Sequence, residues 1–435
     1  MNYSEIPNFQ KTAEQISLYA QLGIEIQVPE LQAIFDRMKQ AQDKVLESLQ
    51  QAVVGNMLST TEPNSLIDIR KLRPSGPRRI WNKLDKHEYA ERLAGALLAR
   101  FAGCLLGAVV EGYPIETMEK LAREASTPFP PTDYWTKIKD PYNERCYRFI
   151  REDYTRQKMT AALPDDDITY TLLGLFIAEE YGLDFTTVDV GKAWVKYLPM
   201  ACTAEEVALN NLKNGIPAET AAEVDNPYYQ WIGADIRSDP WGYIAPGYPE
   251  LAAEMAWRDA YLSHRRNGIY GEMFFSAVIS AAFTVDSPME AVRVGLSEIP
   301  AECELAKAVK WTIAEAKNIH DYKSARAAVD KKFAGMSHIH TINNACLTIF
   351  GLSIGGTDMT KVISETVAMG MDNDCTAATA GSIVGAVIGK SRVPEYWYKP
   401  FNNRVATYLN GNPEFKITDV VQRFITLATK IYDSK

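Results

Sequence analysis

The sequence predicts an all-α protein, in which a compact helical domain follows an N-terminal helical extension. From Lys86 onward the chain holds a series of segments that are long enough for helices and apolar on one broad face. Stretches that alternate apolar and polar residues, as half-buried strands do, are scarce. Small residues also recur at every fourth position in two of the segments, a spacing that lets two helices approach closely.

The first 85 residues are predicted to form a helical extension and a linker. Residues 13–53 are rich in helix formers, and apolar residues from Leu31 to Leu49 follow helical spacing. Residues 55–77 collect Gly, Pro, Ser, Thr and Asn, which predicts a loop. Residues 86–435 are predicted to form the main helical domain.

Within the main domain the apolar segments predict a succession of helices. The predicted helices cover residues 90–107, 168–181, 271–283, 288–299, 304–320, 341–350, 359–369 and 377–389. The rows of small residues are Gly103 and Gly107 in the first helix and Gly381, Gly385 and Gly389 in the last. Glycine costs roughly 1 kcal/mol relative to alanine inside a helix. We therefore expect these glycines where another backbone comes close.

Composition narrows the classes of function. The chain has 435 residues, a formal charge of −9 and a pI of about 5.3, which disfavours a nucleic-acid partner because such partners require a basic face. No apolar run reaches the roughly 18 residues of a membrane span, so no membrane partner is expected. The N-terminus has no secretory pattern, and the six cysteines form no CxxC pair. These features predict a reduced, cytoplasmic protein without structural zinc.

Two acidic clusters stand at the starts of predicted helices. The first is Pro164-Asp165-Asp166-Asp167, and the second is Gly370-Met371-Asp372-Asn373-Asp374-Cys375. Aspartate at a helix start often caps free N–H groups, which would explain either cluster without a ligand. Adjacent carboxylates at the edge of an apolar segment nevertheless repel each other, and a divalent cation would offset that cost. We therefore expect the two clusters to hold one or two hard cations between them.

At these residues the sequence resembles the ADP-ribosylglycohydrolase family. Gly103-Cys104-Leu105-Leu106-Gly107 and the following Glu111 are similar to the opening helix and glutamate of that family. Asp165-Asp166-Asp167 is similar to its first metal motif, usually Thr-Asp-Asp-Thr. Asp372-Asn373-Asp374-Cys375, followed by a small-residue helix, is similar to its second, usually Asp-Thr-Asp-Thr. The resemblance covers about residues 90–395, with weaker similarity at residues 233–237, at His264 and at residues 271–273.

The resemblance implies an all-α catalytic domain that binds two Mg²⁺ ions, with Mn²⁺ as the alternative, and hydrolyses a glycosidic bond to ADP-ribose. The implied metal ligands are Asp165, Asp166, Asp167, Asp372, Asp374 and Cys375. The implied catalytic groups are Glu111, Asp167 and Asp374. The implied substrate-binding residues are Gly233, Asp235, Arg237 and His264, with Arg237 expected to bind a diphosphate through its bidentate fork. The expected partner is a small-molecule or protein-linked ADP-ribosyl compound.

Several positions depart from the family pattern. Cys104 stands where aspartate is frequent, Cys375 where threonine is usual, and Ile168 where a threonine follows the first acidic pair. These departures favour an alternative, a non-catalytic member that binds ADP-ribose or a nucleoside or has a structural role. A further alternative keeps the enzyme and replaces the substrate by a smaller ribosyl or nucleoside-like compound. The complete set of aspartates favours the enzyme.

Overall fold

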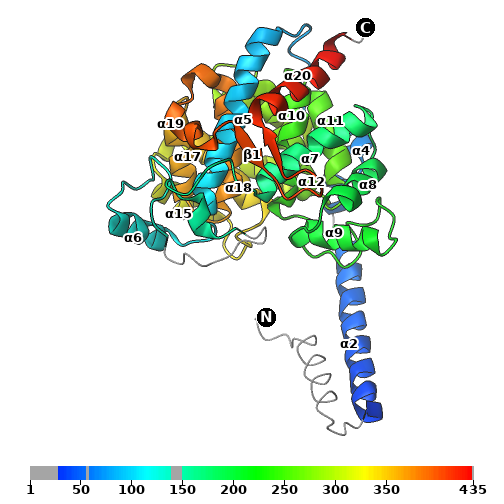
Figure 1. Ribbon diagram of the computed structural model, residues 1–435. Coiled ribbons are helices and arrows are strands. Elements are labelled where there is room, and N and C mark those ends of the chain that lie inside the picture. Colours follow the sequence, from blue (N-terminus) through cyan, green and yellow to red (C-terminus); the bar gives the residue numbers. More distant parts are fainter. Residues whose placement is uncertain (1–27, 55–57, 139–148, 434–435) are drawn as a thin grey trace. The chain divides into compact units, whose positions relative to one another are not determined.

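The computed structural model describes residues 28–54, 58–138 and 149–433 (Figure 1). Contacts divide the chain into two units, residues 1–60 and 61–435. The first unit contains α2 (Val28–Val54), which confirms the predicted helix over the residues described; residues 13–27 lie outside them. The short helix α3 (Leu58–Thr61) spans the division. The boundary predicted at residue 85 stays a prediction.

The second unit is built almost entirely of helices, which confirms the predicted all-α class. Its α-helices are α4 (Leu66–Leu72), α5 (Lys86–Ala108), α6 (Ile115–Ala125), α7 (Asp166–Tyr181), α8 (Thr187–Tyr197), α9 (Thr203–Lys213), α10 (Asp239–Ile244), α11 (Pro249–Ala260), α12 (Asn267–Ala282), α13 (Pro288–Gly295), α14 (Glu304–Glu315), α15 (Tyr322–Lys332), α16 (Thr341–Gly355), α17 (Met359–Ala368), α18 (Asn373–Ile388), α19 (Glu395–Tyr398) and α20 (Ile417–Asp433). The 3₁₀ helices are η2 (Arg151–Tyr154), η3 (Ile232–Arg237), η4 (Leu296–Glu298), η5 (Ala316–Asn318), η6 (Lys390–Arg392) and η7 (Lys399–Phe401). Within the described residues, no helix is both long and apolar enough to cross a membrane.

Helices α5 and α18 form the centre of the core and lie side by side (Figure 1). A Cβ atom added to Gly103 would lie 2.1 Å from the carbonyl oxygen of Ala377, and one added to Gly381 would lie 2.3 Å from that of Ala99. The small-residue rows therefore allow the two backbones to meet, as the spacing predicted. This packing places the N-terminus of α18 against the C-terminal half of α5.

A small antiparallel sheet supports the segment that leads into α7. Strand β1 (Arg404–Ala406) pairs with β2 (Glu414–Lys416). Both backbone groups of Ala162 bond to β1: its N–H donates to the carbonyl of Arg404 at 2.9 Å, and its carbonyl accepts the N–H of Ala406 at 2.7 Å. The extended backbone is thus held just before the first acidic cluster.

The predicted loop at residues 55–77 is wrong in part, because α4 lies within it. Ser65 caps this helix by accepting the N–H of Asp68. After α4, within the predicted linker, the guanidinium of Arg78 pairs with the buried Glu298 at 2.7 Å. Local composition missed the helix because its apolar face is short and its stability comes from packing against the rest of the second unit.

Candidate metal centre

The first acidic cluster forms the start of α7. Asp165 is the N-cap, and its Oδ1 accepts the N–H of Asp167 at 3.1 Å. The hydroxyl of Tyr154 donates to the carbonyl of Pro164 at 2.6 Å, which fixes the turn before the cap. Capping thus accounts for one oxygen of Asp165, and it accounts for none of the oxygens of Asp167.

The second acidic cluster forms the start of α18. Asp372 occupies the N-cap position but makes no side-chain capping hydrogen bond. Before it, Gly370 and Met371 both have positive φ, of 71° and 64°, a conformation that costs a residue with a Cβ atom about 1–3 kcal/mol. The Gly112 N–H donates to the carbonyl of Met371 at 3.2 Å, so the turn that carries Glu111 is joined to this segment. Simple capping therefore does not explain Asp372.

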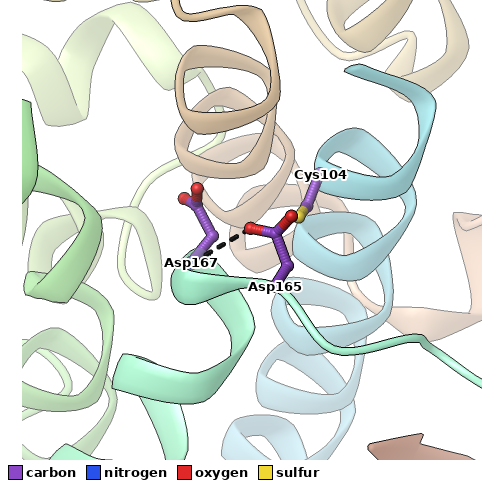
Figure 2. A group of neighbouring side chains, drawn as sticks. All are labelled: Cys104, Asp165 and Asp167. Atoms are coloured by element: carbon purple, nitrogen blue, oxygen red, sulfur yellow. Dashed lines mark hydrogen bonds between the residues drawn. The ribbon is translucent and has the colours of Figure 1, made fainter. Parts of the chain in front are cut away.

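The fold brings the two clusters together. Cys104, Asp165 and Asp167 offer ligand atoms that lie within 4.8 Å of one another, and Asp372, Asp374 and Cys375 offer a second such group. Figure 2 shows the first group, with Cys104 reaching from α5 toward the start of α7. The two groups are contiguous, because the carboxylate of Asp167 interacts with Asp374 and with the thiol of Cys375.

Burial makes this concentration of charge unfavourable without a cation. Burial raises the pKa of Asp167 well above its usual range; the cation of Arg100 opposes this, while Asp374 adds to it. Burial also raises the pKa of Asp372, and the charges of Asp374 and Glu111 raise it further. Glu111, the predicted catalytic glutamate, is half-buried in the turn after α5, and the action of its charge on Asp372 indicates that it lies close to the second group.

The residues present fit a divalent cation. Oδ2 of Asp167 and Oδ1 of Asp372 are buried and receive no hydrogen bond at normal geometry from the described residues. Buried carboxylate oxygens without a donor are costly, and metal coordination satisfies them. Asp166, the other predicted ligand of α7, is half-buried, and its charge acts on Cys375. The six predicted ligands therefore gather in one region, between the start of α7 and the start of α18.

Arg100 is a component of the centre that sequence reasoning missed. This fully buried side chain on α5 donates to the carbonyl oxygen of Asp167 at 2.8 Å and lies 3.3 Å from its Oδ1. Its other terminal nitrogen is 2.6 Å from Oδ2 of Asp239. An arginine on the apolar side of a Leu- and Ala-rich segment was the available signal, since such a residue is buried only when paired.

The predicted substrate residue Arg237 lies at the centre of a second buried ion cluster. Its guanidinium bonds to Asp259 and to Glu205 at 2.6 Å each and lies 3.5 Å from Glu272. Burial raises the pKa of Glu205 to about 7, although Arg237 opposes the shift. The charge of Asp166 also raises the pKa of Glu205, which links this ion cluster electrostatically to the metal centre. Sequence reasoning missed Glu205 and Asp259 and noted Glu272 only as part of the weak similarity at residues 271–273, because the three carboxylates come from three separate helices.

The other predicted substrate residues lie beside this ion cluster. A Cβ atom on Gly233 would lie 2.1 Å from Glu205, so this glycine makes room for the carboxylate. Oδ2 of Asp235 accepts the Thr341 hydroxyl at 2.5 Å. His264 is fully buried with its Nδ1 2.8 Å from the Ser263 hydroxyl, and burial lowers its pKa well below the usual value. The four predicted residues are thus brought together, and their contact with substrate stays a prediction.

Comparison with known proteins identifies the family. The family model described as ADP-ribosylglycohydrolase matches residues 85–430. The chain belongs to the ADP-ribosylglycohydrolase family. The family implies glycohydrolase activity on ADP-ribosyl compounds. No individual curated protein matches the sequence.

A solved structure shows the same fold. The chain is similar to a protein of an "ADP-ribosylglycohydrolase-related protein complex", with 18% identity and a TM-score of 0.52. The match covers 80% of this chain and 98% of the other. At this identity the likeness extends to the fold alone, which agrees with the predicted ADP-ribosylglycohydrolase-like helical domain.

Proposed function

We propose that this chain is a divalent-cation-dependent hydrolase that cleaves an N- or O-glycosidic bond to ADP-ribose or a related ribosyl compound. The observation that carries the proposal is the convergence of the two acidic clusters, in which Asp167 of α7 interacts with Asp374 of α18. Each cluster alone is compatible with capping. Their meeting in a buried site is costly without a cation, and a purely structural protein gains nothing from it.

The proposal gives each of the chain's own residues a role that is compatible with its position. Asp165, Asp166, Asp167, Asp372, Asp374 and Cys375 would hold the cations, for which the family resemblance implies Mg²⁺ or Mn²⁺. Bound there, a cation supplies Lewis-acid polarisation and lowers the pKa of water. Glu111, half-buried in the turn beside Asp372, is placed to accept a proton from attacking water. Asp167 and Asp374 are the carboxylates that stabilise positive charge developing on the anomeric carbon.

The test is release of ADP-ribose. The protein is incubated with ADP-ribosyl-arginine, ADP-ribosyl-serine and an ADP-ribosylated protein, each with Mg²⁺, with Mn²⁺ or with EDTA, and free ADP-ribose is measured by chromatography. We expect release with a divalent cation and none with EDTA. Asp419→Asn, which changes an exposed aspartate in the first turn of α20, serves as the control and should retain full activity.

The thiols of Cys104 and Cys375 in the ligand groups favour the second candidate, a non-catalytic member that binds ADP-ribose. Calorimetric binding of ADP-ribose without turnover of any substrate would support that candidate. Turnover of a free ribosyl compound, without binding of ADP-ribose, would instead indicate a smaller substrate. The predicted cytoplasmic location stays a prediction.

A further inference from the structure

Each of the two ligand groups contains one thiol. The first combines Sγ of Cys104 with Asp165 and Asp167, and the second combines Sγ of Cys375 with Asp372 and Asp374. The ligand atoms in each group lie within 4.8 Å of one another. The two thiols come from different helices, α5 and α18, so two independent positions in the sequence place sulfur at the same centre.

The thiols stand among charged groups, which is unusual for cysteines that only fill space. Cys104 is fully buried, and the charges of Asp165, Asp167 and Asp374 act on its thiol. The charges of Asp167, Asp372 and Asp374 act on the thiol of Cys375. A buried structural cysteine behaves as a small hydrophobe. Cys346 illustrates that behaviour, because it is buried on α16 and its thiol hydrogen-bonds uncharged groups, the carbonyl of Ala308 at 3.9 Å and the side chain of Thr312.

A second observation indicates that the thiols face a ligand. Oδ2 of Asp167 is fully buried and receives no hydrogen bond at normal geometry, and the same holds for Oδ1 of the 9% exposed Asp372. One such oxygen belongs to each of the two groups. Each group thus combines a carboxylate oxygen available for coordination with a neighbouring sulfur atom.

Carboxylate and thiolate ligands favour different cations. Mg²⁺ prefers oxygen ligands in near-ideal octahedral geometry, whereas thiolate favours softer ions. For a given mixed site, affinity rises from Mn²⁺ through Fe²⁺ and Co²⁺ toward the end of the first transition row. Coordination requires each thiol to lose its proton to solvent. The bond between sulfur and the cation offsets the free energy of that deprotonation.

We propose that this centre binds a borderline divalent transition-metal cation, of the class of Fe²⁺, Co²⁺ and Zn²⁺, in preference to Mg²⁺, with the sulfur atoms of Cys104 and Cys375 as ligands. This inference rests on the proposed function and specifies its cation. It departs from the Mg²⁺ or Mn²⁺ that the family resemblance implies, and the departure follows from the two positions at which this chain carries cysteine.

The direct test is a Co²⁺ titration of the full, metal-free chain, followed by absorption. Sulfur coordination gives a thiolate-to-cobalt charge-transfer band in the near ultraviolet, whereas oxygen ligands alone do not. We expect this band in the wild type. Cys375→Ser and Cys104→Ser, which keep the side-chain size and replace sulfur by oxygen, should each weaken the band. Cys346→Ser is the matched control and should leave it unchanged.

Competition measures the selectivity without relying on the variants. Zn²⁺ and Mg²⁺ are each titrated against the bound Co²⁺, with the band and the melting temperature as readouts. We expect Zn²⁺ to displace Co²⁺ at concentrations roughly tenfold or more below those at which Mg²⁺ does so. In the two cysteine variants the preference for Zn²⁺ over Mg²⁺ should fall.

The outcomes separate this inference from the proposed function. Co²⁺ binding without the band, together with equal competition by Mg²⁺, would overturn the sulfur ligation and leave a metal-dependent hydrolase in place. A band that disappears in Cys346→Ser and persists in the other two variants would also overturn it. If no divalent cation shifts the melting temperature or binds, the metal dependence of the proposed function itself fails.

Discussion

Gly107 of α5 lies directly against the backbone of Asp374 at the start of α18. A Cβ atom on Gly107 would be 2.5 Å from both the nitrogen and the Cα atom of Asp374. Real Cβ atoms do not approach backbone so closely, so glycine at this position sets the distance between the two helices. The position of a predicted metal ligand is therefore determined by a residue that has no side chain.

Gly107→Ala should consequently disturb the metal centre. The added methyl group must push the start of α18 away, and overpacking of this kind costs about 1–3 kcal/mol. We expect a lower free energy of unfolding in urea and a weaker rise of the melting temperature on adding a divalent cation.

Gly191→Ala is the matched control for this change. Gly191 lies inside α8, and its added Cβ would meet only side chains, the nearest atom being 3.3 Å away on Leu212. Alanine favours the helix over glycine by about 1 kcal/mol, so stability should be kept or raised and cation binding unchanged. Equal effects of the two substitutions would show that contact with Asp374 is not the cause.

Asp374→Asn should abolish hydrolysis while the fold persists. The amide keeps the shape and removes one charge that acts on both Asp167 and Asp372. Repulsion in the metal-free protein falls, so its melting temperature should stay the same or rise. The stabilisation by added cation, about 2.7 kcal/mol at a hundred times the Kd for the wild type, should largely disappear. Wild-type activity in this variant would remove Asp374 from the site.

Arg237→Met should destabilise the protein strongly. The substitution leaves Glu205, Asp259 and Glu272 buried around the place of the lost cation. Breaking a buried ion pair on one side costs about 3–5 kcal/mol, which a urea unfolding curve would measure.

Arg423→Met is the control for Arg237. Arg423 pairs with Glu179 where both side chains are about one-third exposed, at 29% and 34%, and such surface pairs contribute about 0–1 kcal/mol. A stable Arg237→Met protein with weakened ADP-ribose affinity would support the predicted contact of Arg237 with a diphosphate over the structural role.

Protonation of His340 should lower the free energy of unfolding in acid. Its Nδ1 accepts the Ile342 N–H at 3.2 Å and caps α16, a bond that requires neutral Nδ1, and burial lowers its pKa from 6.5 to about 4. Between pH 4 and pH 6.5 the unfolded chain therefore binds more protons at His340 than the folded chain does. The contribution of neutral His340 to the free energy of unfolding is complete above pH 6.5. It is lost as the pH falls toward 4, by at most about 3 kcal/mol.

The measurement compares urea unfolding at about pH 4.5 and pH 7 in the wild type and in His340→Asn. Asparagine is a good N-cap that does not titrate in this range. The variant should lose less stability than the wild type on acidification. Equal losses would indicate that other groups cause the acid dependence.

The sequence predicted several parts of this structure because their signals are local. The acidic clusters, the small-residue rows and eight helices could be recognised from neighbouring residues; these helices are α5, α7, α12, α13, α14, α16, α17 and α18. Other helices of the second unit, such as α8, α11 and α20, were not predicted. The helix α4 could not, because its seven residues depend on packing against the rest of the unit. The partners of Arg237 could not be found either, since Glu205, Asp259 and Glu272 are far apart along the chain.

By itself, the sequence determined the all-α class, the family and the identities of the potential ligands, because composition, periodicity and motifs are properties of short segments. Only the tertiary structure decided that the two acidic clusters share one site, that a thiol stands in each ligand group, and that Arg100 and Arg237 are enclosed by carboxylates. The physical reason is that these relationships depend on helix packing. The close approach of α5 and α18 at glycine positions brings together residues as far apart in the chain as Gly107 and Asp374.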